Sequence, residues 1–346
     1  MPKVREYGLK IGTLPPGTKN CITDVKGVKV GHATLYEPAD GGDYACTGVT
    51  AILPHEGNLF REKLVAASYV INGFGKTAGL VQVDELGTLE SPIMLTNTLS
   101  APEAQAAGIE YMLEQTEEIT SINVVTGECN DSKLNSIRRR FVTKEHAREA
   151  LSRASTNPST EGAIGAGKGM VCFGYKGGIG CSSRLIPYED GELSVGILTL
   201  TNFGRQEEFK YADWGTDANK ALNDEKHLND GSIMIIMATD APLSDRQLKR
   251  VAKRCGIGVG RTGGHWGHGS GDIVIAFSTA KKIAHIPSGR TESITQLREN
   301  DSVFNQLFQA AAEATEEAIL NSLAQAETTV GHQGNVIYRF EWGTRG

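Results

Sequence analysis

The sequence lacks both a long apolar run and an excess of basic residues. No stretch approaches the roughly 20 apolar residues that a transmembrane helix needs, and the first seven residues lack the apolar region of a secretory signal. Lysine plus arginine number 35 against 41 aspartate plus glutamate, giving a formal net charge of −6. Because binding to nucleic acid needs a basic surface, we expect a cytoplasmic protein that binds neither nucleic acid nor membranes.

Cysteine is sparse and scattered. The six cysteines form no C-x-x-C pair, so the sequence predicts neither a disulfide framework nor a zinc site, and we expect free, buried thiols. Cys129 lies in a polar motif, Gly127-Glu128-Cys129-Asn130-Asp131, but it has no neighbouring cation that would stabilise a thiolate. We therefore do not expect Cys129 to be a nucleophile.

The chain also lacks internal repeats and a linker rich in proline or serine, which favours one domain spanning residues 1–346. Capping signals at Ser100, Ser244 and Ser302 predict helices that end near Gln115, Gly256 and Gln325. Apolar, β-favouring segments predict strands at residues 49–53, 80–83, 93–96, 122–125, 195–201, 233–238, 273–277 and 336–340. Several are apolar on both faces, which suggests sheets that are covered on both sides. Because the connections look like turns rather than crossovers, we expect a layered α+β fold rather than a doubly wound sheet.

Three motifs suggest cofactors but lack the required context. The G-x-G-x-x-G segment at residues 258–263 follows a predicted helix rather than a strand, which argues against dinucleotide binding. Residues 162–168 have the spacing of a phosphate-binding loop, but Gly169 stands where a serine or threonine would bind Mg²⁺. His265 and His268 lie three residues apart in a glycine-rich loop, a spacing that fixes no metal geometry. We expect no cofactor and no metal.

The most informative segment is the turn Asn229-Asp230-Gly231-Ser232 that leads into an apolar strand. If the Gly231–Ser232 bond were cut, Ser232 would have both a hydroxyl nucleophile and a free α-amine. An α-amine has a pKa of roughly 7.7–8.0, so it can accept the hydroxyl proton near neutral pH. The alternative is that Asp-Gly-Ser is only a turn.

Polar residues at two other strand ends could complete such a site. Ser270 and Asp272 are two residues apart in an extended segment, so their side chains point the same way and can form a proton relay. Asn202 ends a third strand, and its amide could donate a hydrogen bond to a developing oxyanion. Each has a structural alternative, because Asp272 could cap a turn and Asn202 could be an ordinary turn residue.

A series of short motifs extends nearly from end to end. In chain order they are Ile22-Thr23-Asp24-Val25, Val30-Gly31-His32, Cys46-Thr47-Gly48-Val49-Thr50, Asn72-Gly73-Phe74-Gly75, Gly127-Glu128, Asn130-Asp131, Gly165-Ala166-Gly167, Gly177-Gly178-Ile179-Gly180, Ser182-Ser183-Arg184, Asp230-Gly231-Ser232, Ala238-Thr239-Asp240-Ala241-Pro242-Leu243 and Ser270-Gly271-Asp272. On these motifs the chain resembles the L-aminopeptidase D-amidase/D-esterase family, which includes the β-peptidyl aminopeptidases.

The resemblance implies a four-layer αββα sandwich, similar to that of the amino-terminal nucleophile hydrolases but with different strand connectivity. It implies self-cleavage between Gly231 and Ser232 into an α chain of residues 1–231 and a β chain of residues 232–346. It also implies Ser232 as nucleophile, Ser270 and Asp272 as the relay pair, and Asn202 at the oxyanion. The αβ units are expected to form a homo-oligomer, most simply a tetramer.

Two positions depart from the family pattern. Asp272 stands where glutamate is common, and it is shorter by one methylene. Lys133 stands where a tyrosine usually helps to bind the oxyanion; it could donate a charge-assisted hydrogen bond there or turn to solvent. Glu128 is a candidate anchor for the ammonium group of a substrate.

The function that we expect is that of a self-processing serine aminopeptidase or amidase, acting on short peptides, amino-acid amides or esters. Substrates with β- or D-amino acids are included, and the sequence does not distinguish among them. One alternative is an acyltransferase on the same fold, although such relatives usually have threonine as the nucleophile. The other is a small-ligand binding protein that is never processed.

Overall fold

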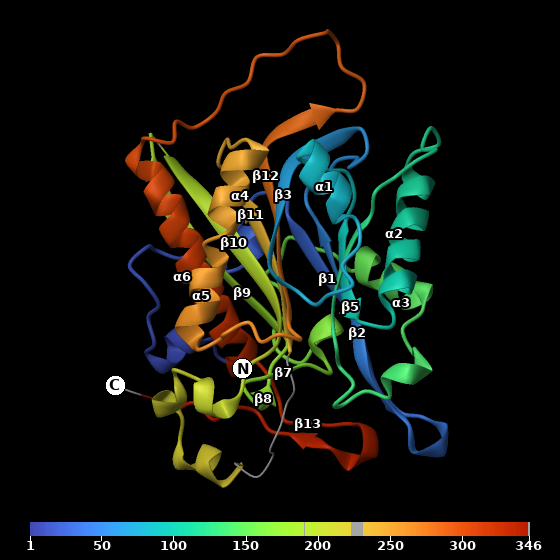
Figure 1. Ribbon diagram of the computed structural model, residues 1–346, viewed down its shortest axis with the longest axis vertical. Coiled ribbons are helices and arrows are strands. Elements are labelled where there is room, and N and C mark those ends of the chain that lie inside the picture. The colour runs from blue at the N-terminus through green and yellow to red at the C-terminus, as the bar shows by residue number, and fades with distance from the viewer. Residues whose placement is uncertain (190, 223–230, 345–346) are drawn as a thin grey trace.

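Two β-sheets pack face to face and helices cover both outer faces (Figure 1). The computed structural model describes residues 1–189, 191–222 and 231–344. The larger sheet has the strand order β4-β3-β12-β11-β10-β9 and the smaller sheet the order β1-β2-β5-β6. The expected αββα sandwich is therefore confirmed.

The strands of the larger sheet are β3 (Glu62–Gly73), β4 (Thr88–Leu89), β9 (Ile179–Tyr188), β10 (Gly191–Asn202), β11 (Ser232–Thr239) and β12 (Gly271–Ala284). Those of the smaller sheet are β1 (Lys29–Pro38), β2 (Tyr44–Leu53), β5 (Ile93–Asn97) and β6 (Val125–Cys129). Two short hairpins complete the described strands: β7 (Val171–Cys172) with β8 (Tyr175–Lys176), and β13 (Thr329–Val330) with β14 (Val336–Ile337).

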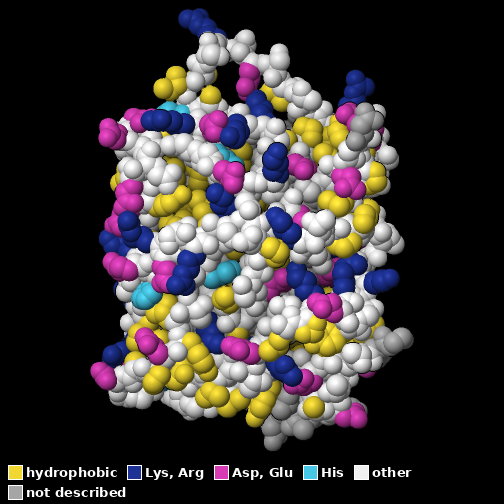
Figure 2. Space-filling view, turned by 180° about the vertical axis from the view of Figure 1, so that it is seen from behind, with side chains coloured by type: hydrophobic (Ala, Val, Ile, Leu, Met, Phe, Trp, Pro, Cys, Tyr) yellow, Lys and Arg dark blue, Asp and Glu magenta, His cyan; other side chains and the backbone are white. Residues whose placement is uncertain are grey.

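Three helices cover the outer face of the larger sheet: α4 (Asp245–Ala252), α5 (Cys255–Thr262) and α6 (Ser302–Ala324). On the smaller sheet lie α2 (Ala101–Gln115) and α3 (Lys144–Ser152), while α1 (Leu80–Leu86) packs against β3. None of these helices, within the part of the chain that the structure describes, is long and apolar enough to cross a lipid bilayer. Figure 2 shows basic and acidic side chains interspersed over one face of the molecule.

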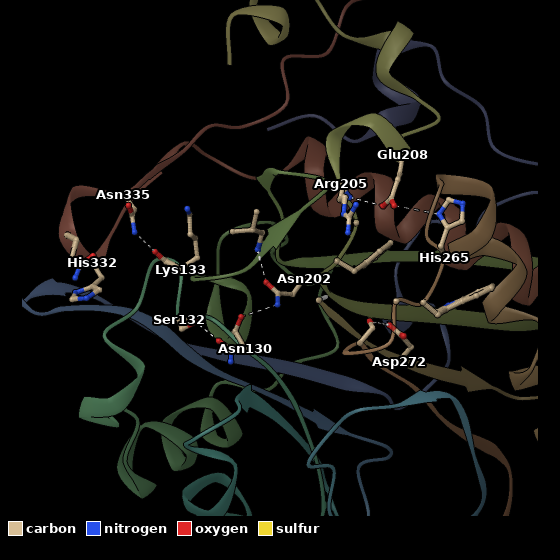
Figure 3. Close-up of a pocket in the computed structure, with 18 residues that line it drawn as sticks. Asn130, Ser132, Lys133, Asn202, Arg205, Glu208, His265, Asp272, His332 and Asn335 are labelled. Atoms are coloured by element: carbon tan, nitrogen blue, oxygen red, sulfur yellow. Dashed lines mark hydrogen bonds and ion pairs between the residues drawn. The ribbon is translucent and has the colours of Figure 1, made fainter. Parts of the chain in front are cut away.

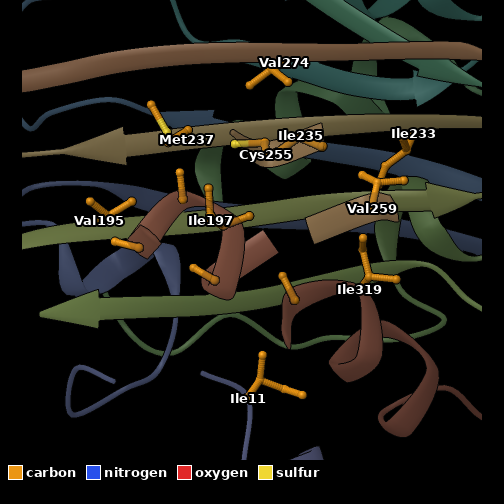
Figure 4. Close-up of a cluster of buried hydrophobic side chains, with 14 of the residues drawn as sticks. Ile11, Val195, Ile197, Ile233, Ile235, Met237, Cys255, Val259, Val274 and Ile319 are labelled. Atoms are coloured by element: carbon orange, nitrogen blue, oxygen red, sulfur yellow. The ribbon is translucent and has the colours of Figure 1, made fainter. Parts of the chain in front are cut away.

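Strand β11 shows why the two-sided apolar pattern produces two cores. Its odd-numbered residues Ile233, Ile235 and Met237 pack with the helices of the outer layer (Figure 4). Its even-numbered residues Met234 and Ile236 pack against the other sheet. Because successive side chains of a strand point to opposite faces, a strand that is covered on both sides has to be apolar throughout.

The sequence placed seven of the fourteen described strands and three of the six described α-helices, and it missed the long strands β1, β3 and β9. Two of its assignments were wrong. Residues 80–83 were expected to form a strand and instead begin α1, which is bracketed by Gly79 and Gly87 in left-handed conformations. Gly256 was expected to end a helix, but α4 ends at Ala252 and Gly256 lies inside α5. The G-x-G-x-x-G segment is thus largely helical, and its glycines serve packing: a Cβ on Gly258 would lie 2.5 Å from the Ala312 carbonyl oxygen of α6.

Three boundaries were also misplaced. The strand expected at residues 122–125 is β6, which begins at Val125, where pairing with Ile93 starts. Of residues 336–340 only the first two form a strand. Asp301, rather than Ser302, caps α6, because the Asp301 side chain accepts the Val303 N–H.

A buried ionic cluster joins α6 to β9. Arg184 is fully buried and contacts Glu317 at 2.7 Å and Glu313 at 3.2 Å. From the amino-terminal segment, Arg5 donates to both carboxylate oxygens of Glu317 at 2.7 Å. Buried carboxylates need such partners, because leaving them uncompensated is costly.

We predict that Arg184→Met destabilises the fold strongly, since it leaves Glu313 short of a cation and Glu317 dependent on Arg5. The expected loss is about 3–5 kcal/mol. The matched control is Arg61→Met, which removes an exposed pair with Glu118 and should leave the free energy of unfolding nearly unchanged. Denaturant unfolding would be measured in the Ser232→Ala background, because the expected self-cleavage would otherwise divide the chain; equal losses in the two variants would contradict the prediction.

Candidate active site

The register of three adjacent strands brings the predicted catalytic residues to one end of the larger sheet. In the antiparallel pair β10–β11, Asn202 lies directly opposite Ser232. In the parallel pair β11–β12, Ser232 is aligned with Gly271, between Ser270 and Asp272. Residues that are 30 to 70 positions apart in the sequence therefore meet at the ends of neighbouring strands.

Ser232 is nearly buried, at 8% exposed, and its hydroxyl oxygen accepts the Gly271 N–H at 3.2 Å. The same N–H also contacts the carbonyl oxygen of Gly231 at 3.3 Å. The hydroxyl and the carbonyl of the preceding peptide bond thus share one donor. A Cβ on Gly231 would lie 1.9 Å from the Asn202 carbonyl oxygen, so only glycine fits there without rearrangement.

Ser270 and Asp272 form the expected pair. The Ser270 hydroxyl donates to Asp272 Oδ1 at 2.8 Å, and both side chains are buried. Aspartate therefore reaches Ser270 despite its shorter side chain. The sequence assigned no role to Asn72, although it belongs to one of the motifs. Its amide donates to the carbonyl oxygen of Ser270 and, at 3.0 Å, to that of Gly267. These bonds hold the segment that leads into β12.

The Asn202 amide is held in one orientation by two hydrogen bonds (Figure 3). Its Oδ1 accepts the Val171 N–H at 3.0 Å, and its Nδ2 donates to the Asn130 carbonyl oxygen at 3.0 Å. Since the oxygen is engaged on one side, the NH₂ group must face the other way. An amide nitrogen has two hydrogens, so one N–H remains for a further acceptor.

The Val171 donor depends on a buried lysine that sequence reasoning missed. Lys176, on β8 of the same hairpin, is fully buried and donates to the carbonyl oxygens of Gly167, Met170 and Gly177 at 2.7–2.9 Å. Burial lowers the pKa of Lys176 to about 7. Three carbonyls around one ammonium fix the loop that presents the Val171 N–H to Asn202.

Glu128 is buried on β6, which belongs to the smaller sheet. One carboxylate oxygen accepts the Lys76 N–H at 2.9 Å, and the other accepts the Thr98 hydroxyl. A Cβ on Gly75 would lie 3.8 Å from Glu128 Oε1 and 3.7 Å from Gly271 Cα. Glu128 is therefore separated from the start of β12 by little more than Gly75.

A cavity of about 480 Å³ opens onto these residues. Of the predicted site residues, it is lined by Asn202, Gly231, Ser270, Asp272 and Lys133, whereas Ser232 and Glu128 are not among its lining residues. The sequence did not indicate several other lining residues, which come from separate loops: Asn130, Arg205, Glu208, Trp266, His332 and Asn335.

Two groups that were discounted from the sequence lie nearby. Burial raises the pKa of the Cys129 thiol well above its ordinary value, and all six cysteines are free and buried. His265 lines the cavity with its Nδ1 4.0 Å from Glu208. Over the described ranges, no group of three or more histidine, cysteine, aspartate or glutamate side chains is arranged to hold a metal ion.

Comparison with known proteins identifies this arrangement. Residues 20–337 match the sequence model of peptidase family S58. The β-peptidyl aminopeptidase BapA of Sphingosinicella microcystinivorans is 36% identical over 357 residues, which covers 98% of this chain and 89% of BapA.

Two solved structures have the same fold. The PH0078 protein of Pyrococcus horikoshii OT3 is 48% identical, with a TM-score of 0.91, covering 98% of this chain and 96% of that one. The L-aminopeptidase D-Ala-esterase/amidase of Ochrobactrum anthropi, described as a variant of the Ntn hydrolase fold, is 33% identical, with a TM-score of 0.89. That match covers 99% of this chain and 96% of the other.

Proposed function

This chain belongs to peptidase family S58, and on that premise we propose that it cuts its own Gly231–Ser232 bond and then works through the new amino terminus. The chain is a hydrolase of the serine aminopeptidase and amidase type.

One observation above all supports self-cleavage: the Gly271 N–H contacts both the Ser232 hydroxyl and the Gly231 carbonyl oxygen. In the proposed step, Ser232 Oγ attacks the Gly231 carbonyl carbon and passes its proton to the Ser270–Asp272 pair. Negative charge then develops on the Gly231 oxygen, where an N–H already points, and such pre-oriented donors stabilise transition states.

Collapse of this intermediate breaks the bond between the Gly231 carbonyl carbon and the Ser232 nitrogen, which takes up the proton as an amine. An ester then joins Gly231 to Ser232 Oγ. Water hydrolyses that ester, so Gly231 becomes a carboxyl terminus and Ser232 a free amino terminus. The products are an α chain of residues 1–231 and a β chain of residues 232–346.

The mature site repeats the same chemistry on a substrate. The Ser232 amine accepts the proton of its own hydroxyl as Oγ attacks the substrate carbonyl, and the second N–H of Asn202 binds the oxyanion. Glu128 is the proposed anchor of the substrate ammonium, since a buried cation needs a partner. Water then releases the acyl group.

For the substrate class we extend to this chain what the names of its relatives state. Those names are β-peptidyl aminopeptidase and L-aminopeptidase D-Ala-esterase/amidase, so the proposed substrates are short β-peptides, amino-acid amides and D-alanine esters. A serine nucleophile and a cavity of about 480 Å³ suit such small acyl compounds.

We also propose that the αβ units assemble into a homo-oligomer, most simply a tetramer, in the cytoplasm. Large apolar side chains are exposed on α1 and at the end of β3, namely Val81, Leu86, Val70 and Phe74, and Val81 is 88% exposed. Exposed apolar side chains of this size support the proposal, because interfaces between subunits bury such groups. Six free cysteines fit a reducing compartment. Light scattering would measure the mass, and a monomeric αβ unit would contradict the assembly.

The processing proposal predicts two chains in the mature protein. Sequencing of the smaller chain should begin Ser-Ile-Met-Ile-Ile. Ser232→Ala should remain one inactive chain, whereas Ser232→Cys should still be cut, because a thiol is intrinsically more nucleophilic. The exposed Ser288→Ala serves as control and should mature normally. A single full-length, active chain would refute self-cleavage.

The oxyanion proposal predicts that Asn202→Ala lowers kcat far more than it raises KM, because the amide acts chiefly in the transition state. Loss of one such donor typically costs about 10²–10³ in kcat. Rates on amino-acid p-nitroanilides would be expressed per mole of cut chain, so that a change in the extent of maturation does not alter the measured kcat. Asn305→Ala, on the exposed face of α6, is the control. An effect on KM alone would assign Asn202 to ground-state binding instead.

A further inference from the structure

We infer that the outer rim of the cavity binds a carboxylate on the leaving group, so that this enzyme prefers peptides with a free carboxyl terminus to neutral amides. The residues assigned to this subsite are Lys133 and Arg205. The inference rests on the proposed function, because it takes Ser232 as the point of cleavage.

Two cations from different parts of the chain face the same cavity. Lys133 follows β6, and Arg205 follows β10; both line the cavity and both are at least partly exposed to solvent. In the view of Figure 3, Lys133 lies to the left of Asn202 and Arg205 to its upper right. Arginine and lysine together form an ordinary recognition site for a carboxylate.

The main chain that presents Lys133 is held in place. Asn335 donates its Nδ2 to the Lys133 carbonyl oxygen at 2.9 Å, and Asn335 itself lines the cavity with His332. On the opposite wall, the Arg205 main-chain N–H donates to Glu208 Oε2 at 2.9 Å. Both cations therefore project from anchored backbone rather than from unsupported loops.

The acidic side chains at the cavity already have donors within the protein. Asp272, at the inner end, accepts the Ser270 hydroxyl at 2.8 Å. Glu208 accepts the Arg205 N–H and lies 4.0 Å from His265 Nδ1.

The acidic and basic side chains are also arranged to match the two charged ends of a short peptide. Glu128, the proposed ammonium anchor, is buried next to Gly75 behind the start of β12 and outside the cavity lining. Lys133 and Arg205, by contrast, line the cavity itself. A zwitterionic peptide would thus place its ammonium at the buried acid, its scissile carbonyl at Ser232 and its carboxylate at the two cations.

The test compares two substrates that differ only in this charge: β-alanyl-glycine and β-alanyl-glycinamide, with the L-alanyl pair in parallel. The unsubstituted enzyme should favour the free acid by about fivefold to tenfold in kcat/KM, mainly through KM, as one partly exposed ionic contact allows. Lys133→Gln should shrink this ratio, and Lys133→Gln with Arg205→Gln should bring it near one.

Two controls separate the subsite from general charge effects. Lys29→Gln removes a lysine of similar exposure on β1, away from the cavity, and should leave the ratio unchanged. Raising the ionic strength should reduce the ratio for the unsubstituted enzyme, because salt screens exposed charges. Equal kcat/KM for acid and amide, or a preference that survives in the double variant, would overturn the inference.

A failure of the proposed function would be recognised separately, as hydrolysis of neither peptide nor any p-nitroanilide. The subsite is then decided by binding to the uncut Ser232→Ala protein, measured by NMR titration with N-acetylglycine and N-acetylglycinamide. Tighter binding of the acid that disappears in the double variant supports the subsite. Equal binding of the two probes refutes it.

Discussion

The pairing register of β10, β11 and β12 is the constraint on which the rest of the site depends. Side chains alternate between the faces of a strand, so a slip of one residue would turn Ser232 away from Asn202 and Gly271. The apolar residues of β11 prevent that slip, because it would exchange its two sets of core contacts. The same alternation that builds the sandwich thus fixes the chemistry at its end.

Local sequence predicted what local physics controls. The apolar strand after Ser232, the i, i+2 relation of Ser270 and Asp272, and the helix capped by Ser244 follow from periodicity and capping. The cap expected at Ser100 was wrong, because its side chain makes no capping hydrogen bond at the start of α2. Local sequence does not explain Gly258 of α5, because the Ala312 carbonyl oxygen that leaves no room for its Cβ lies in α6, more than fifty residues away. Lys176 was missed for a similar reason: only the folded hairpin shows three carbonyls converging on its ammonium.

The family resemblance added what spacing alone could not, namely the roles of residues on separate strands. The structure then refined that assignment. Asp272 reaches Ser270 in spite of its length, and Val171 accounts for the orientation of Asn202. Lys133 lines the cavity together with Arg205, a juxtaposition that no local pattern could reveal. Loops far apart in the chain determine such neighbours, so they become visible only in three dimensions.

The proposed cut changes what the ionic cluster of Arg184 with Glu313 and Glu317 holds together. Arg5 and Arg184 precede Ser232, whereas both glutamates follow it, so the cluster becomes a contact between two separate chains. Refolding of the cut protein would then be a second-order reaction, dependent on concentration. The persistence of the mature enzyme would then depend on a low rate of unfolding rather than on efficient refolding. Its folded state would be the one that formed in the uncut precursor.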